Sequence, residues 1–178
     1  GQVSYRDYKF ETYDKVLSQA MRGGGRIYSA AYIMPPGSSA FGYSAKHQNH
    51  LKLLERMMEQ KLPEILRKLP NMQQAFELIR SYPTIGNFLA YQFVTDINYS
   101  EVTGFSEMEF VVPGPGALDG LRKCFGDGGG LGGEYLIRLM AENQQYEFDR
   151  LEINFESLWG RPLQPVSYTH LTLPTTPY

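Results

Sequence analysis

The stretch NMQQAFELIRSYPTIGNFLAYQFVTDIN (residues 71–98) decides the fold of this chain. Apolar residues recur at helical spacing on both sides of a short break, which predicts helices over 71–82 and 86–98. The second helix is apolar on two sides, so we expect it to be mostly buried. The break itself, YPTIG (82–86), predicts a tight turn that joins the two helices.

Helical periodicity continues outside this stretch. It predicts helices within 1–22, over 44–68 with a break at Pro63, before Gly126, and over 134–151. Glycine-rich and proline-rich stretches predict a turn at 22–26 and loops at 35–45 and 127–133, and Ser106 with Glu109 has capping-box spacing. The short apolar stretch 27–34 is either a strand or a buried helix. The sequence therefore predicts a mainly α fold, a single helical domain over 1–165 with little or no sheet.

The composition excludes several classes of protein. The chain has 178 residues, of which 42% are hydrophobic and 20% charged, which is typical of a globular domain with a core. Its net charge of −2 gives no overall basic field, so any DNA contact has to be local. Cys124 is the single cysteine, which excludes a disulfide framework and favours a reducing compartment. With no signal peptide and no apolar run long enough to span a bilayer, we expect a cytoplasmic protein, or a nuclear one in a eukaryote.

The two ends of the chain look unnatural. The last residues, VSYTHLTLPTTPY (166–178), resemble a translated sequencing adapter, and the chain begins with Gly1 instead of Met. We therefore expect a fragment, as from a metagenome, truncated at both ends, and we leave 166–178 out of the fold prediction as a non-native tail.

The helix–YPTIG–helix arrangement resembles the helix-hairpin-helix of DNA repair glycosylases, whose turn has the pattern Leu-Pro-Gly-hydrophobic-Gly. Such a turn exposes the free N–H groups at the start of a helix, which bind a phosphate without net positive charge. This predicts DNA-backbone contacts by the five residues Tyr82, Pro83, Thr84, Ile85 and Gly86. Thr84 replaces the first glycine of the pattern, and a plain packing joint between two helices is the alternative.

A pair of basic residues and a missing aspartate also bear on the expected interaction with DNA. Arg122 and Lys123 form a solvated basic pair that we expect to touch DNA. The catalytic aspartate of glycosylases would fall near Pro113 and Gly114, which cannot transfer protons, so a conventional glycosylase is disfavoured.

Polar residues on two of the predicted helices form the candidate reactive site. In KHQNHLKLLERMM (46–58), His47 and His50 share a face with Leu54 and Met58, an apolar stripe that we expect to point into the core. Gln92 and Asp96 lie one turn apart on the mostly buried helix. We expect a pocket between these helices, lined by Lys46, His47, His50, Gln92 and Asp96. The histidines are either reactive or hydrogen-bonded core and cap residues, and Asp96 is either a catalytic acid or a structural anchor. Two histidines without a third ligand do not predict zinc, and the identity of any metal stays open.

Four motifs in one order, RIYSAAYIM, KHQNHLKLLERMM, YPTIGNFLAYQFVTDINYS and EFVVPGPGALDG, resemble the helical domain family of alpha-glutamyl/putrescinyl-thymine pyrophosphorylase and 5-hydroxymethyluracil DNA kinase. The resemblance spans about residues 10–165. It implies a glycosylase-like helix-hairpin-helix fold and a role in phage-type thymine hypermodification, in which 5-hydroxymethyluracil in DNA is phosphorylated and the activated base is then substituted.

The resemblance also implies ligands and residue roles. ATP and Mg²⁺ would be cofactors, and modified duplex DNA would be the partner. Asp96 would be a base or metal ligand, and His47 and His50 would move a proton or, with Lys46, hold phosphate. Phe88 and Tyr91 would stack on a flipped base.

Three functions stay open from the sequence alone. The first is a base-modifying transferase or kinase. The second is a DNA-binding module of a larger protein with a further catalytic domain, and the absence of a P-loop motif favours this reading. The third is a divergent glycosylase.

Overall fold

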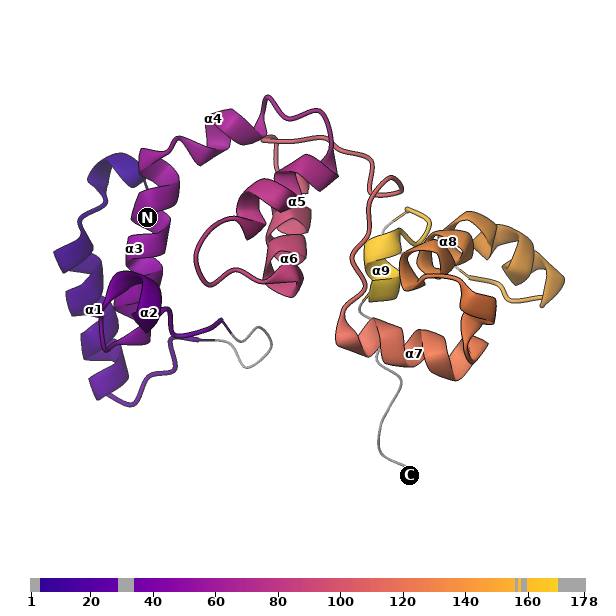
Figure 1. The fold of residues 1–178 in the computed structure, drawn as a ribbon, viewed down its shortest axis with the longest axis horizontal. Coiled ribbons are helices and arrows are strands. Elements are labelled where there is room, and N and C mark those ends of the chain that lie inside the picture. Colours follow the sequence, from indigo (N-terminus) through magenta and orange to yellow (C-terminus); the bar gives the residue numbers. More distant parts are fainter. Residues whose placement is uncertain (1–3, 29–33, 156, 158–159, 170–178) are drawn as a thin grey trace. The chain divides into compact units, whose positions relative to one another are not determined.

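The computed structural model describes residues 4–28, 34–155, 157 and 160–169, and these residues form a mainly α structure without β-strands (Figure 1). The predicted fold class is confirmed. The helices fall into two compact units, one of residues 1–70 and 74–103, the other of residues 71–73 and 104–178. The expected helix or strand at 27–34 falls mainly outside the described residues.

The first unit begins with a 3₁₀ turn and two longer helices. The turn η1 (Tyr5–Asp7) precedes α1 (Phe10–Arg22), and α1 packs beside α3 (Lys46–Glu59), as Figure 1 shows. Gly23–Gly25 end α1, so the predicted turn at 22–26 is confirmed, with Gly24 in the left-handed region at φ 79°. The predicted loop 35–45 contains one helical turn, α2 (Ser38–Phe41), which also packs on α3.

The predicted helix 44–68 is two helices. α3 ends at Glu59, and α4 (Leu62–Leu66) follows after Lys61, which has a left-handed φ of 55°. Pro63 lies in the first turn of α4, where its missing N–H costs no hydrogen bond, so the break precedes the proline. The buried face of α3 also differs from the predicted stripe, because Leu53 is in the core and Leu54 is 44% exposed.

The pair α5 (Met72–Arg80) and α6 (Asn87–Asn98) confirms the two helices expected around YPTIG. α6 is mostly buried, as predicted, with Ala90 and Val94 fully enclosed. The apolar core of the first unit comes from α3 to α6 and the bend between α5 and α6, with buried side chains at Leu51, Leu53, Leu62, Leu66, Ala75, Phe76, Ile79, Tyr82, Ile85, Leu89, Ala90, Tyr91 and Val94.

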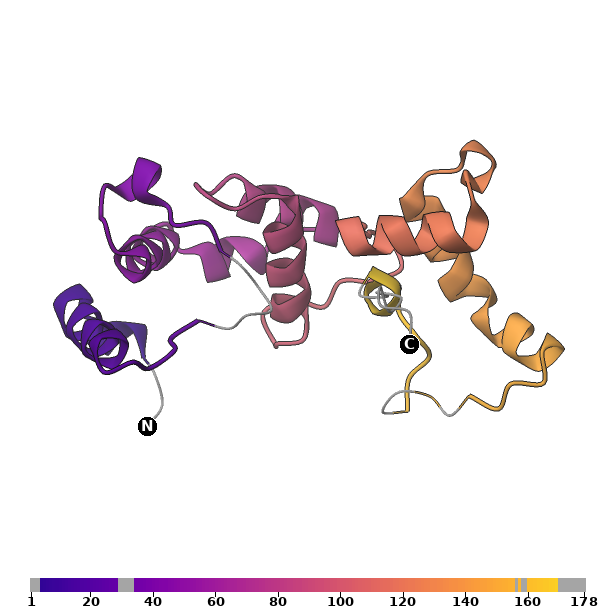
Figure 2. The ribbon, with the colours of Figure 1, turned by 90° about the horizontal axis from the view of Figure 1, so that it is seen from below.

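The second unit is built from α7 (Pro115–Phe125), the 3₁₀ turn η2 (Gly128–Gly130), α8 (Gly133–Arg150) and α9 (Pro165–Thr169). Figure 2 shows α7 and α8 side by side. A Cβ atom at Gly133 would lie 2.8 Å from a methyl carbon of Leu118, so glycine allows α8 to start against α7. No helix follows Ser106, so the capping-box prediction at 106–109 is wrong; the Glu109 N–H instead closes a turn on the Ser106 carbonyl at 3.4 Å.

The first residues of the predicted tail are packed. α9 lies against α7 and α8, and Val166 and Tyr168 are buried there. The Gln144 side chain holds the preceding segment by two 2.8 Å hydrogen bonds to the Leu163 backbone. Excluding 166–169 from the fold was therefore wrong, because apolar residues at helical spacing pack whatever their origin. Residues 170–178 lie outside the described part, and the non-native origin of 166–178 stays a prediction.

Among the described residues, no helix is long and apolar enough to cross a membrane.

Candidate functional site: a hairpin, a histidine network and an apolar cavity

The bend between α5 and α6 has the backbone of a glycine-containing hairpin. Tyr82 and Ile85 are each 6% exposed and anchor the bend, and the Ile85 N–H donates to the Tyr82 carbonyl at 3.3 Å. Thr84 has a φ of 70°, a left-handed conformation that glycine adopts freely and that costs other residues about 1–2 kcal/mol. Thr84 therefore adopts the left-handed conformation that the glycine of the pattern would adopt.

The start of α6 is open. Gly86 is the N-cap residue, its neighbours Asn87 and Phe88 are exposed, and no side chain of the cap closes the helix end. A Cβ atom added at Gly86 would meet nothing within 4 Å. The first N–H groups of a helix lack intrahelical acceptors, so this end can accept an anion.

The other residues predicted to contact DNA or a base lie in different settings. Arg122 and Lys123 are exposed in the last turn of α7, in the second unit, and Lys123 forms an exposed ion pair of 2.8 Å with Asp119. Phe88 is 43% exposed, but Tyr91 is 1% exposed. The prediction that Tyr91 stacks on a flipped base is wrong for this conformation, because its ring is part of the core.

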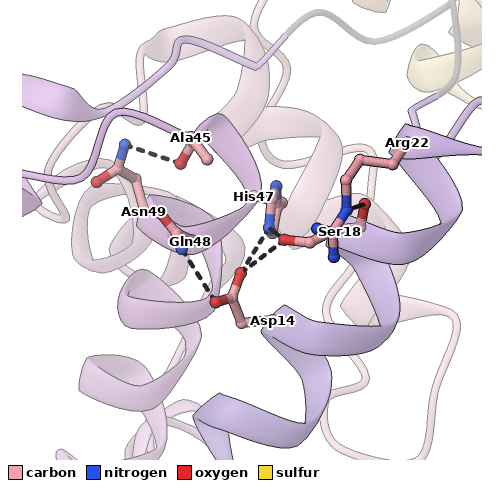
Figure 3. A network of polar contacts seen from close by, with 7 residues as sticks. All are labelled: Asp14, Ser18, Arg22, Ala45, His47, Gln48 and Asn49. Atoms are coloured by element: carbon pink, nitrogen blue, oxygen red, sulfur yellow. Dashed lines mark hydrogen bonds and ion pairs between the residues drawn. The ribbon is translucent and has the colours of Figure 1, made fainter.

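His47 belongs to a polar network between α1 and α3, shown in Figure 3. Its Nε2 lies 2.8 Å from Oδ1 of Asp14 and 3.1 Å from Oγ of Ser18. The Ser18 hydroxyl donates to the same Asp14 oxygen at 3.1 Å, and the Gln48 amide donates to Oδ2 at 3.0 Å. Hydrogen bonds from Gln48 and His47 hold the pKa of Asp14 below its usual value.

The network assigns the protons of His47. A carboxylate only accepts hydrogen bonds, so Nε2 carries the proton that faces Asp14. The other ring nitrogen, Nδ1, is buried and has no hydrogen-bond partner among the described residues. His47 itself is 4% exposed. Nε2 thus donates to a carboxylate, while Nδ1 is a buried acceptor without a donor among the described residues.

His50 and Lys46 contact a different part of the chain. His50 Nε2 lies 2.8 Å from the Pro35 carbonyl and therefore donates, while Nδ1 accepts from the Tyr28 hydroxyl at 2.8 Å. Burial, with a smaller effect of the Lys46 charge, lowers the pKa of His50. Lys46 Nζ lies over the Tyr28 ring, 4.6 Å from its centroid. Both ring nitrogens of His50 thus have hydrogen-bond partners within the protein.

Asn49 lies fully buried between the two histidines and organises the loop before α3. Its Oδ1 accepts from the Tyr43 N–H at 3.0 Å, and its Nδ2 donates to the carbonyls of Pro36 and Tyr43 at 2.9 Å each. A longer contact of 3.4 Å reaches the Ala45 carbonyl (Figure 3). The side chain fixes the segment that leads into the histidine network.

Asp96 lies elsewhere. It is exposed and borders an apolar cavity of about 320 Å³ between the C-terminal half of α3 and α4 to α6. Leu54, Met57 and Met58 form the α3 wall of this cavity, and Phe93 is among the α6 residues. Gln92 is buried at 7% exposure and does not line it.

The predicted pocket of Lys46, His47, His50, Gln92 and Asp96 is therefore wrong as a single site. A cavity does separate α3 from α6, but the histidines lie on the first turns of α3, where the side chains of Asp14, Ser18 and Tyr28 and the Pro35 carbonyl bind them. Asp14, Ser18 and Gln48 were not predicted from the sequence. Asp14 and Ser18 have i, i+4 spacing on one helix, but no local pattern indicates a partner 33 residues away.

The described residues include no ligand cluster built for a magnesium ion. Among them, no group of three or more His, Cys, Asp or Glu side chains could hold a metal ion. Mg²⁺ is commonly held by one or two carboxylates together with substrate phosphates, and neither Asp96 nor Asp14 belongs to such a group.

Comparison with known proteins identifies the family. No curated protein and no solved structure matches the chain. One family does match, over residues 1–172, and its description is "5-hmdU DNA kinase, helical domain". This match covers nearly the whole sequence and both helical units, so the chain belongs to the family of the helical domain of 5-hmdU DNA kinases.

Proposed function

We propose that this chain is a DNA base-modification domain that binds the backbone of DNA containing 5-hydroxymethyluracil and presents the base for phosphorylation or substitution. Family membership supports a role in 5-hydroxymethyluracil modification. The observation that supports DNA binding is the open N-terminus of α6. It follows a hairpin turn in which Thr84 has the left-handed φ that is typical of glycine. Amides at such a turn bind phosphates without sequence preference, which suits a protein of net charge −2.

Residues near the hairpin are the proposed contacts. Gly86 is exposed and Pro83 and Thr84 are half-buried, while Tyr82 and Ile85 anchor the bend from the core. The Thr84 hydroxyl is buried without a hydrogen-bond partner among the described residues, so Thr84 would contact DNA through its backbone. Phe88, which is 43% exposed in the first turn of α6, would stack on a base. Arg122 and Lys123 on the second unit would add backbone contacts.

Asp96 is the proposed reactive carboxylate. It borders a cavity with Met57, Met58 and Phe93, whose flat and polarisable side chains suit a pyrimidine ring. A carboxylate at the edge of that cavity can accept a hydrogen bond from the hydroxymethyl group of the base. ATP, with its Mg²⁺, would be held by a further catalytic domain, because the described residues offer no metal ligand cluster.

The proposal has two measurable parts. Fluorescence anisotropy with a short labelled duplex tests DNA binding; we expect saturable binding that weakens as salt rises. Absence of binding at low salt overturns the proposal. Incubating the full-length protein with hydroxymethyluracil DNA and ATP, followed by nucleoside mass spectrometry, tests the reaction; we expect a phosphorylated or substituted nucleoside that disappears in Asp96→Asn.

A non-catalytic DNA-binding module is the second candidate. It is favoured by the separation of Asp96 from the histidine network, because the first unit then lacks a joint acid–base cluster. Duplex binding with unchanged nucleosides supports the module, and abasic sites would instead indicate a glycosylase.

A further inference from the structure

A second cavity, of about 440 Å³, lies beside the histidine network. Five of its lining residues come from α1 and the sixth is His47 of α3: they are Asp14, Lys15, Ser18, Met21, Arg22 and His47. Lys15, Ser18 and Arg22 have i, i+3, i+7 spacing, which places them on one face of α1. The cavity is thus a polar surface of α1 closed on one side by a buried imidazole.

The carboxylate in this cavity is already occupied. Asp14 accepts hydrogen bonds from His47 and Ser18 on one oxygen and from Gln48 on the other. These three donors stabilise the ionised form of the carboxylate, so its charge of −1 remains. Asp14 therefore positions His47, and the two positive charges of Lys15 and Arg22 outnumber its single negative charge in the cavity.

The two cations in the cavity, unlike Asp14, have few partners among the described residues. Lys15 and Arg22 are exposed, and neither forms a salt bridge with a described residue. Arg22 donates one hydrogen bond, from Nε to the Ser18 carbonyl, at 3.3 Å. A guanidinium has five N–H donors, so the remaining ones are available to a ligand.

His47 has one ring nitrogen without a partner. The residue is more than nine-tenths buried, and its Nδ1 lacks a hydrogen-bond partner among the described residues. Nε2 carries the ring proton, so Nδ1 is an acceptor, and the group that would satisfy it is a donor such as a water molecule or the O–H of a hydrogen phosphate ion.

We propose that this cavity binds a phosphate group through Lys15 and Arg22, with the Asp14–His47 pair as its inner wall. Arginine and lysine together provide a planar donor pair and a point charge, the combination that suits phosphate oxygens. The phosphate comes either from a free nucleotide or from the DNA backbone. The site does not depend on the proposed base modification, since it is separate from the α6 hairpin and from Asp96.

Isothermal titration of the full chain with inorganic phosphate, ADP and a short unmodified duplex tests the site. The test variant is the double substitution Lys15→Gln and Arg22→Gln, and the matched control is Arg67→Gln with Lys68→Gln, two exposed cations of the same unit. We expect the test variant to bind about tenfold more weakly or worse, because charge-assisted hydrogen bonds are lost, and the control to match the wild type. Thermal melts check that both variants fold.

The outcomes separate the sources of phosphate. Weaker binding of phosphate and ADP in the test variant alone identifies a nucleotide site, and weaker binding of the duplex alone identifies a DNA-backbone contact. Equal losses in both variants, or no wild-type binding of any probe, overturn the proposal. If the site binds phosphate but no base is modified, the proposed function fails while this inference stands.

Discussion

The two halves of α3 differ in what they contact. The first turns carry His47, Asn49 and His50, whose side chains bind residues that precede α3 in the chain. The last turns carry Leu54, Met57 and Met58, which line an apolar cavity with residues that follow α3. One helix therefore serves two surfaces, and the polar half is separate from Asp96, which borders the apolar half.

Removing the buried amide should show the largest difference between the halves. Asn49→Ala leaves the Tyr43 N–H and the Pro36 carbonyl without their partner, and we expect a loss of about 3 kcal/mol in unfolding free energy. Leu54→Ala, at a side chain 44% exposed, should cost less than about 1 kcal/mol. Urea unfolding measures both, and similar losses would contradict the larger contribution of the buried Asn49 side chain to stability.

Double-mutant cycles should separate the two carboxylates. Asp14→Ala and His47→Ala should be non-additive, because the two side chains share a 2.8 Å contact. Asp96→Ala and His47→Ala should add within about 0.5 kcal/mol, as residues without shared partners do. A coupling energy between Asp96 and His47 would contradict their separation and support the single pocket predicted from the sequence.

The smallest expected effect is a pH dependence from His50. Its pKa is lowered in the folded protein from the usual 6.5, chiefly by burial, so the unfolded chain binds the proton first. The stability contribution is therefore complete above the unfolded value of 6.5 and is lost as the pH falls through the folded pKa. His50→Gln should flatten the slope of stability between neutral and mildly acidic pH. An unchanged slope would show that burial does not keep His50 neutral in the folded protein.

Helical periodicity was sufficient to predict the fold class and the principal helices, including the hairpin at 82–86. It did not predict the features that depend on packing between residues far apart in the sequence. The periodicity of α3 placed Leu54 in the core, but packing selected Leu53, one residue away on the helix. Asp14 as the partner of His47 depends on how α1 packs against α3, which single-sequence spacing does not encode. The left-handed Thr84 shows the reverse case, because the surrounding packing imposes a conformation that the residue type disfavours.

The central claim is that open amides at the start of α6 bind the DNA backbone, and a pair of glycine N-caps tests it. Gly86 of α6 and Gly132 of α8 are both exposed N-caps, and an added Cβ would meet nothing within 4 Å at either position. Valine at each site should therefore perturb folding similarly, but only Gly86→Val places a side chain in the path of a phosphate. We predict that Gly86→Val weakens duplex affinity by about tenfold, since hydrogen bonds to a charged group are lost, and that Gly132→Val leaves it unchanged. Equal affinities for the two variants would contradict the claim.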